Sequence, residues 1–451
     1  MALAARCSGK TMAVMNAPAR RNIFVVGLDD FHLAQLRALP GPENYVFHAL
    51  FTREEVKPCA RFPVRRILIE GRERLAQFAG TVDAVVGFWD FPVSTILPLL
   101  RQARDLPGPT LESVLKCEHK YWSRLEQARV APEHIPAFCA VNPFADDPLR
   151  EVTLDFPFWI KPVKSVLSYL GFRINDAHDF RRAMEQIRRE IDRFGEPFNH
   201  VLGHATLPPE VAGVDGNHCI AEALISEGRQ CTLEGYAWQG AVRVYGAVDS
   251  LREGAAGSSF SRYQYPSTLP DGVQARMGEI TDRVIRQVGY DCAPFNVEFY
   301  WDEATDRIWL LEINTRISKS HAPLFRMVDG CYHHQVMIDL GLGREPAMPH
   351  RQGEFACAAK FMVRRYQDAR VVRMPTPGEI TAVEAEFPGV VVQIEVAEGM
   401  LLSQLCYQDS YSYEVATLFV GAADNTELER TYTRVMERLP MEFEPVDEAQ
   451  P

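Results

Sequence analysis

Two glutamates flank a short polar turn in the second half of the chain. Glu298 lies in the strand-like run "FNVEFYW" and Glu312 in "RIWLLEIN", with the turn "DEATD" at 302–306 between them. If the two runs pair around this turn, the two carboxylates stand nearly opposite each other on one face of a hairpin. Asn314 shares that face, because side chains alternate along a strand. Two carboxylates and an amide oxygen on one face predict a site for a hard divalent cation such as Mg²⁺.

The same hairpin has a plainer interpretation, in which both acids are simply exposed to solvent. Against it, Glu312 lies in the apolar run "WLLEIN", where a buried acid needs a partner. Two carboxylates at that distance also repel each other unless a cation or a proton lies between them. The hairpin by itself leaves both interpretations open.

Two lysines lie where they could bind phosphate. Lys161 ends the apolar strand "FPFWIK" immediately before Pro162, and Lys120 lies on the preceding helix "EHKYWSR". An ammonium group at the end of a buried strand can act as a point charge on phosphate oxygens. Taken singly, each lysine also fits an ordinary solvated side chain.

Composition narrows the class of protein. The chain has 451 residues, 47% of them hydrophobic, which predicts about three compact units. A formal net charge of −12 argues against a nucleic-acid-binding protein. We see neither a bilayer-length apolar run nor a secretory signal, so we expect a cytoplasmic protein without a membrane partner. Ten cysteines with no Cys-x-x-Cys pair predict reduced, buried thiols.

The helices and strands that carry these residues are expected in successive segments of the chain. Their pattern predicts an α/β (α+β) fold class. Residues 1–20 read as a flexible tail, and residues 21–117 alternate strands and helices, which predicts a parallel sheet. No Gly-x-Gly-x-x-Gly follows the first strand, so we do not expect NAD or FAD there. Residues 118–345 carry the lysines and the hairpin, with a small lobe at about 150–222, and residues 346–451 form a last α+β unit.

The order of these elements resembles the ATP-grasp superfamily over most of the chain, most specifically at "FNVEFYWDEATDRIWLLEINTRI". The resemblance implies a parallel pre-ATP-grasp domain, a two-lobed ATP-grasp domain and a C-terminal domain. It implies that ATP binds with Mg²⁺, or Mn²⁺, held by Glu298, Glu312 and Asn314. Further residues take their roles from the same resemblance: Lys120 and Lys161 on the ATP phosphates, Glu222 under the adenine, the backbone of Ala223, Leu224 and Ile225 on the adenine edge, and Arg316 facing the reacting groups.

Two segments depart from the family pattern. Gln230, in "GRQCT", stands where the family usually has a ribose-binding glutamate, and Glu227 is an alternative contact to the ribose. The flap over the triphosphate, usually glycine-rich, reads "KSVLSYLGF" here, with only Gly171. Glycines let backbone N–H groups approach phosphates closely. Side chains therefore replace them in our interpretation (Lys164, Ser165 and Ser168), and weakened or lost ATP binding stays open.

The end of the chain resembles the C-terminal domain of biotin carboxylase, but two functional positions differ. Ser320 stands where that enzyme has a glutamate base, and Tyr265 where it has a lysine. The chain then resembles the ATP-grasp carboxylate–amine ligases that join amino acids, and we expect a homodimer acting on small molecules. Candidate substrate contacts are Arg252, Arg262, Tyr265 and His321, whereas His333 and His334 fit structural roles. A biotin-carboxylase-like enzyme and a non-catalytic nucleotide-binding protein remain alternatives.

Overall fold

The computed structural model describes residues 20–58, 61–166, 169–225, 228–253, 259–406, 408 and 412–446. The predicted tail, apart from Arg20, lies outside the described residues. Within the described part of the chain, the strands form sheets of three, eight, two and four strands.

The first unit contains the predicted parallel sheet. Its strands β1 (Arg21–Leu28), β2 (Tyr45–Thr52) and β3 (Ala84–Val86) are arranged in the order β2-β1-β3, and both pairings are parallel. The strand β3 is shorter than the apolar run "DAVVGFW", because the chain then bends over the end of β1, where the Trp89 indole donates to the Gly27 carbonyl (2.7 Å). The helices α4 (Val93–Gln102) and α12 (His334–Gly341) both pack against β3. Since α12 comes from a later segment, the first unit is joined firmly to the rest of the molecule.

A four-stranded antiparallel sheet forms the small lobe. Its order is β4-β7-β5-β6, with β4 at Phe138–Val141, β5 at Phe158–Pro162, β6 at Phe172–Ile174 and β7 at Cys219–Ala223. The amphipathic helix that we predicted begins after the Asp176 cap and buries one apolar face: Phe180, Ala183, Met184 and Ile187. It breaks at Ile191 into α7 (Ala177–Glu190) and α8 (Asp192–Leu202).

One eight-stranded sheet runs from the acidic hairpin into the C-terminal segment. Its order is β12-β11-β8-β9-β10-β13-β16-β15. The bounds are β8 Arg229–Trp238, β9 Ala241–Glu253, β10 Ser259–Tyr265, β11 Ala293–Asp302, β12 Arg307–Asn314, β13 Cys357–Arg365, β15 Val390–Ile394 and β16 Tyr413–Ala422. The join is the antiparallel pairing of β10 with β13, in which Tyr263 lies opposite Lys360. The segments that the sequence suggested as two domains therefore share one sheet.

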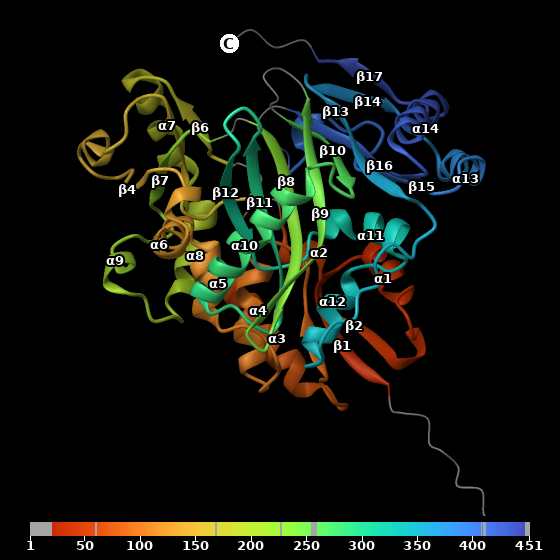
Figure 1. Ribbon diagram of the computed structural model, residues 1–451, viewed down its shortest axis with the longest axis horizontal. Coiled ribbons are helices and arrows are strands. Elements are labelled where there is room, and N and C mark those ends of the chain that lie inside the picture. Colours follow the sequence, from red (N-terminus) through yellow and green to blue (C-terminus); the bar gives the residue numbers. More distant parts are fainter. Residues whose placement is uncertain are drawn as a thin grey trace, which may run out of the picture.

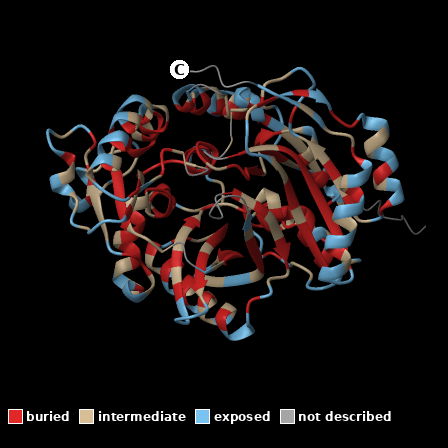
Figure 2. Ribbon diagram, turned by 90° about the horizontal axis from the view of Figure 1, so that it is seen from above, coloured by how far each residue is buried: buried red, intermediate tan, exposed pale blue. Residues whose placement is uncertain are grey.

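The remaining elements cover these sheets. In Figure 1 the first unit (red to orange) lies below the large sheet, the small lobe lies to the left, and the C-terminal elements (blue) lie at the upper right. Figure 2 shows the buried residues concentrated in the strands and the exposed residues on outer helices and loops. The other elements are α1 Asp30–Arg37, α2 Arg53–Val56, α3 Val64–Gln77, α5 Leu111–Glu118, α6 Lys120–Val130, α9 Pro209–Ala212, α10 Asp271–Val288, α11 Ala322–Asp329, α13 Pro377–Glu386, α14 Asn425–Arg438, β14 Ala369–Arg373 and β17 Glu442–Pro445. Among the described helices, none combines the length and apolar character that crossing a bilayer requires.

Among the described cysteines, the prediction of reduced thiols holds with one exception, although Cys139 and Cys292 are only partly buried. Cys406 is disulfide-bonded, so the expectation of reduced thiols is wrong at this position. Free thiols are present at Cys117, Cys139, Cys219, Cys231, Cys292, Cys331 and Cys357.

Candidate active site

A β-bulge brings the two predicted carboxylates face to face. From the turn, β11 and β12 pair with Asp302 opposite Arg307 and Phe299 opposite Leu310, and the register then shifts so that Glu298 lies opposite Glu312. Leu311 is the extra residue. If the register continued without the bulge, Glu298 would pair with Leu311 and Glu312 would point to the other face, since a one-residue slip reverses every side chain. The predicted juxtaposition is confirmed, and the bulge is its cause.

The side chain of Arg124, on α6, binds the backbone of this bulge. Its guanidinium donates to the carbonyls of Leu310 (2.8 Å) and Leu311 (2.9 Å), the two residues at which the strand register shifts. It also donates to the Glu222 carboxylate (2.6 Å). The sequence carries no signal for this role beyond an arginine on the buried side of a helix. Arg124 is thus a positioning residue for Glu312.

Amide side chains surround Glu298. Asn314 donates from Nδ2 to Glu298 Oε1 (3.2 Å), and Gln230 donates from Nε2 to Glu298 Oε2 (3.0 Å). Gln230 accepts in turn from Arg252 Nε (3.2 Å). The structure therefore places Gln230, which we predicted at the ribose, against the carboxylate pair, and it brings Arg252 to the same side. The alternative ribose contact Glu227 lies outside the described residues.

The charge state of the pair fits a divalent cation. Burial, together with the negative charge of Glu312, raises the pKa of Glu298. Burial also opposes ionisation of Glu312, but the charges of Lys120 (Nζ to Oε2, 3.7 Å) and Lys161 outweigh it and lower the pKa of that carboxyl. No group of three or more His, Cys, Asp and Glu side chains among the described residues is arranged to hold a metal ion. Two carboxylates and an amide fit Mg²⁺, which keeps other oxygen ligands from water and phosphate.

Both predicted phosphate-binding lysines lie close to the carboxylate pair of Glu298 and Glu312. Lys120 is the first residue of α6, and its Nζ donates to the Ser165 carbonyl (3.2 Å). Lys161, near the end of β5, lies 2.6 Å from Glu222 Oε2. Burial lowers the pKa of Lys161, against the opposing charge of Glu222. Two ammonium groups from different lobes therefore face the acidic hairpin.

In the glycine-poor flap, the described side chains that we predicted to bind phosphate, Lys164 and Ser165, are buried. Lys164 is buried and forms an ion pair with the Glu118 carboxylate, which also accepts from Thr315 Oγ1 (2.6 Å). Ser165 is buried as well, and Ser168 lies outside the described residues. Lys164 is therefore held by Glu118 in this structure, and its predicted role on a phosphate stays a prediction.

Glu222 is the centre of a buried ion cluster at the end of β7. Burial disfavours its charged form, but Arg124 and Lys161 outweigh burial and lower the pKa of Glu222 to about 2. Ala223 ends the strand, and Leu224 and Ile225 follow it without regular structure. In this structure, the acid that we predicted under the adenine joins α6 to the small lobe through Arg124, and its role at the adenine stays a prediction.

Replacing Arg124 with alanine is expected to lower the free energy of unfolding by about 3–5 kcal/mol, because it leaves the buried Glu222 with one cation fewer. Urea unfolding followed by circular dichroism measures this. Arg286→Ala, on α10, is the control: both Arg286 and its partner Asp282 are exposed, so this ion pair should be worth at most about 1 kcal/mol. Equal losses in the two variants would contradict the buried cluster.

Arg316 forms an ion pair with Asp90 of the first unit. Its Nε donates to Asp90 Oδ1 (2.6 Å), in the loop that follows β3. Burial opposes ionisation of Asp90, but the charges of Arg316 and Lys57 lower the pKa of this carboxyl to about 2. The sequence analysis missed Asp90, although an acid just after a buried parallel strand is a recognisable signal for a site. This ion pair brings the first unit into the site.

Glu234 is a second buried acid, near enough to Arg316 for their charges to interact. His321 Nδ1 lies 2.8 Å from Glu234 Oε1, and both side chains are almost fully buried. Burial raises the pKa of Glu234 to about 7 and lowers that of His321 to about 3, where Arg316 adds to the effect. The Tyr263 ring packs edge-on against His321. Glu234 was missed, but an acid inside the apolar strand "CTLEGYAW" could have indicated it.

Two of the predicted substrate contacts, Arg262 and Tyr265, have other partners in this structure. Arg262 points to the other face of β10, where it pairs with Glu429 on α14 (3.0 Å), because it alternates with Tyr263 along the strand. Tyr265 is buried, and its hydroxyl donates to Asp329 (2.8 Å). His333 and His334 are fully buried, as their predicted structural role requires.

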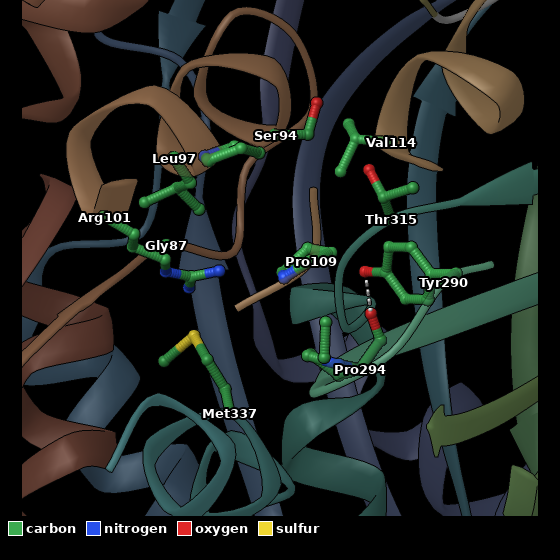
Figure 3. Close-up of a pocket in the computed structure, with 12 residues that line it drawn as sticks. Gly87, Ser94, Leu97, Arg101, Pro109, Val114, Tyr290, Pro294, Thr315 and Met337 are labelled. Carbon is green, nitrogen blue, oxygen red and sulfur yellow. Dashed lines mark hydrogen bonds between the residues drawn. The ribbon is translucent and has the colours of Figure 1, made fainter. Parts of the chain in front are cut away.

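A cavity of about 10 Å³ lies behind the hairpin, between α4, α5 and the loop before β11. Figure 3 shows its lining, with Thr315 on one side, Arg101 on the other, and the Tyr290 hydroxyl donating to the Pro294 carbonyl (2.7 Å). A space of this size holds about one water molecule. It is therefore too small to be the substrate site.

Known proteins resemble this chain in sequence and in structure. A family model described as "ATP-grasp domain" matches residues 154–322. The uncharacterized protein y4rH of Sinorhizobium fredii is 25% identical over 297 residues, which are 64% of this chain and 54% of that protein, so the match spans about half the length of that relative.

Solved structures share the fold over nearly the whole chain. An L-amino acid ligase from Bacillus licheniformis superposes with a TM-score of 0.67 at 14% identity, covering 95% of this chain and 100% of that one. A carboxyaminoimidazole ribonucleotide synthase from Aspergillus clavatus, complexed with ATP, gives 0.64 at 14% identity, with 93% and 98% covered. A biotin carboxylase from Campylobacter jejuni gives 0.63 at 13% identity, with 94% and 92% covered. Residues 154–322 thus match an ATP-grasp domain, and the solved structures share the fold along nearly the whole chain.

Proposed function

We propose that this protein is an ATP-dependent ligase that activates a carboxylate as an acyl phosphate and joins it to an amine, releasing ADP and phosphate. The observation that carries the proposal is the facing pair Glu298 and Glu312, with Lys120 beside it and Arg316 close by. Anionic ligands for a cation and cations for a triphosphate are thus gathered in one place, as phosphoryl transfer requires.

ATP binding between the two lobes would use residues from both. Lys120 and Lys161 offset the phosphate charge, and the chain after Glu222 offers backbone groups at Leu224 and Ile225 to the adenine edge. A bound Mg²⁺, held by Glu298, Glu312 and Asn314, would offset the charge of the transferring phosphoryl group. Two structural neighbours, the synthase complexed with ATP and the biotin carboxylase in its β,γ-ATP complex, support ATP as the nucleotide.

Arg316 would bind the reacting groups. A substrate carboxylate attacks the γ-phosphorus and forms the acyl phosphate, and an amine then displaces phosphate from it. The Arg316 guanidinium offsets the charge that develops on the oxygens during transfer, and Asp90 fixes its orientation through Nε (2.6 Å). Closure of the site against water matters because hydrolysis of the acyl phosphate competes with the amine.

Two residues favour an amine over biotin as the acceptor. Ser320, between Lys319 and His321, has no acid–base group that titrates near neutral pH. Tyr265 is buried against Asp329, so it cannot replace a lysine that contacts substrate. The L-amino acid ligase among the structural neighbours supports the same choice.

A test of this function measures ADP release across a panel of carboxylic acids and amines. We expect ADP release to require a carboxylic acid and to rise with a suitable amine, and hydroxylamine to trap the acyl phosphate as a hydroxamate. Bicarbonate with biotin should give no more ADP than the blank. Carboxybiotin as the product would establish the carboxylase alternative, and no ATP turnover with any acid would favour a non-catalytic nucleotide-binding protein.

A further inference from the structure

Glu234 is a buried acid on the same face of the large sheet as the facing carboxylate pair. Its side chain shares a face of β8 with Gln230, whose amide donates to that pair, because side chains alternate along a strand. On the neighbouring strand β11 it lies opposite Asn296, whose side chain accepts from Asn314 (3.0 Å) and donates to the Arg316 carbonyl (3.2 Å). The proposed mechanism gives this acid no role, although it lies on the face that carries the reacting groups.

His321 is joined to Glu234 through one ring nitrogen only. Its Nδ1 lies 2.8 Å from Glu234 Oε1, and the Ser318 backbone N–H donates to the same carboxylate (3.3 Å). Because an ionised carboxylate only accepts, Nδ1 carries the ring proton and Nε2 presents a lone pair. Nε2 has no hydrogen bond to any described residue, and it is not fully enclosed, unlike the two unpartnered ring nitrogens of His334. His321 therefore offers one acceptor nitrogen to a ligand.

Two neutral side chains, His333 and Tyr245, orient this pair. His333 Nε2 donates to the Ser318 carbonyl (2.9 Å). The other ring nitrogen accepts from the Tyr245 hydroxyl (3.2 Å) and lies 3.8 Å from Glu234 Oε2. Burial lowers the pKa of His333 to about 4 and raises the pKa of Tyr245, so neither is charged at neutral pH. A base oriented by a second group, which its neighbours fix in turn, is the arrangement that proton transfer requires.

The surroundings of the pair place its proton exchange near neutral pH. Burial raises the pKa of Glu234 to about 7, against the opposing charge of Arg316. Burial lowers the pKa of His321 to about 3, and the charges of Arg316 and of Lys360 on β13 add to this effect. Tyr263, on β10, packs its ring edge-on against His321 and stays neutral because burial raises its pKa. The Glu234–His321 pair therefore takes up one proton near neutral pH, and Glu234 holds it.

The second step of the proposed reaction needs a proton acceptor. An amine is mostly an ammonium ion at neutral pH, and its nitrogen has no lone pair for attack until one proton is removed. We propose that His321 is the general base for the attacking amine and that Glu234 accepts the proton from His321. The inference rests on the proposed function and names where the amine binds: at Nε2 of His321, beside the segment that carries Arg316.

Protons and bonds balance in this step. The ammonium transfers one proton to His321 Nε2, and the proton on Nδ1 passes to Glu234 Oε1. The amine nitrogen then forms the C–N bond while the bond from the acyl carbon to the phosphate oxygen breaks. The second proton lost by the nitrogen leaves with the phosphate, and the pair later releases its own proton to water.

Two nucleophiles separate this role from activation of the acid. Hydroxylamine is a much weaker base than an alkylamine, so it is mostly uncharged at neutral pH and attacks without losing a proton first. In His321→Asn, amide formation at neutral pH should fall at least about 100-fold, the scale of general-base catalysis, while hydroxamate formation changes little. Alkaline pH should restore amide formation in this variant, because more of the amine is then unprotonated.

Glu234→Gln tests the second group through the pH dependence. Amide formation by the wild-type protein should rise as pH increases through about 7, where Glu234 gives up its proton, and this inflection should be absent from the variant. Hydroxamate formation should show the same pH profile in both proteins. His218→Asn is the matched control: His218 Nδ1 lies 2.7 Å from Asp215 in the loop before β7, and its loss should leave both products unchanged.

Melting temperatures close to that of the wild type show which variants are folded. Equal loss of amide and hydroxamate in folded His321→Asn would show that His321 serves acid activation, and unchanged amide formation would show that it is not the base. Either result overturns the proposal. If His321→Asn does not fold, persistence of the inflection in Glu234→Gln overturns it. Absence of hydroxamate from the wild-type protein with every acid would refute the ligase function itself, and this role with it.

Discussion

Replacing Glu312 with alanine is expected to reduce Mg²⁺-dependent ADP formation on the order of 100-fold to 1,000-fold, the scale seen when one group that stabilises a transition state is removed. Glu312 is one of two facing carboxylates, and its loss leaves Glu298 to hold the cation with the amide of Asn314 alone. ADP release at saturating acid and amine measures the effect, and addition of EDTA to the wild-type protein should reproduce it.

The control for this variant lies in the same hairpin. Glu303 is exposed in the turn between the two strands, so Glu303→Ala changes the same residue type outside the site and should keep wild-type activity. A melting temperature close to that of the wild type shows that Glu312→Ala keeps its fold. Undiminished turnover of folded Glu312→Ala would show that this hairpin does not hold the metal ion.

Replacing Arg316 with alanine should reduce kcat by about 1,000-fold while ATP affinity changes little. Its proposed partner is the charge that develops during transfer, and arginines in that role contribute at least about 10³ in kcat. Asp90 holds the guanidinium in place in the free protein (2.6 Å), so little reorientation is needed at the moment of reaction. Hydroxamate formation gives the rate, and titration calorimetry with a non-hydrolysable ATP analogue gives the affinity.

Arg262→Ala is the matched control for Arg316→Ala. The sequence suggested both arginines near the substrate, but Arg262 pairs with Glu429 on the other face of the sheet. We expect its loss to change neither the rate nor the affinity. A similar loss of rate in both variants, or a fall in ATP affinity that equals the fall in rate for Arg316→Ala, would contradict the assigned role.

Much of the architecture was predictable because it depends on local pattern. Alternating apolar residues around "DEATD" predict the hairpin, apolar runs separated by helices predict the parallel first sheet, and one-sided apolar spacing predicts α7. Each of these patterns repeats within a few residues, so neighbouring side chains by themselves indicate the element and its buried face. The same holds for Lys161, near the end of β5, and for Arg316, which follows β12.

The sequence by itself therefore determined which kinds of groups are present and on which elements they lie: two acids and an amide on a hairpin, and lysines at a helix start and a strand end. Tertiary structure decided which of them meet. The bulge at Leu311 puts Glu312 on the same face as Glu298, and Arg124 from α6 binds the bulge carbonyls. Such contacts join residues far apart in the chain, and no periodicity within a segment encodes them.

The same reason explains the errors and the omissions. Asp90 reaches Arg316 across 226 positions of the chain, and Glu222 meets Arg124 across 98. The pairing of β10 with β13 merges two segments into one sheet, and its alternation turns Arg262 away from the site. Long-range pairing depends on the packing of whole elements, so only the folded chain shows which charged groups compensate one another and which remain for a ligand.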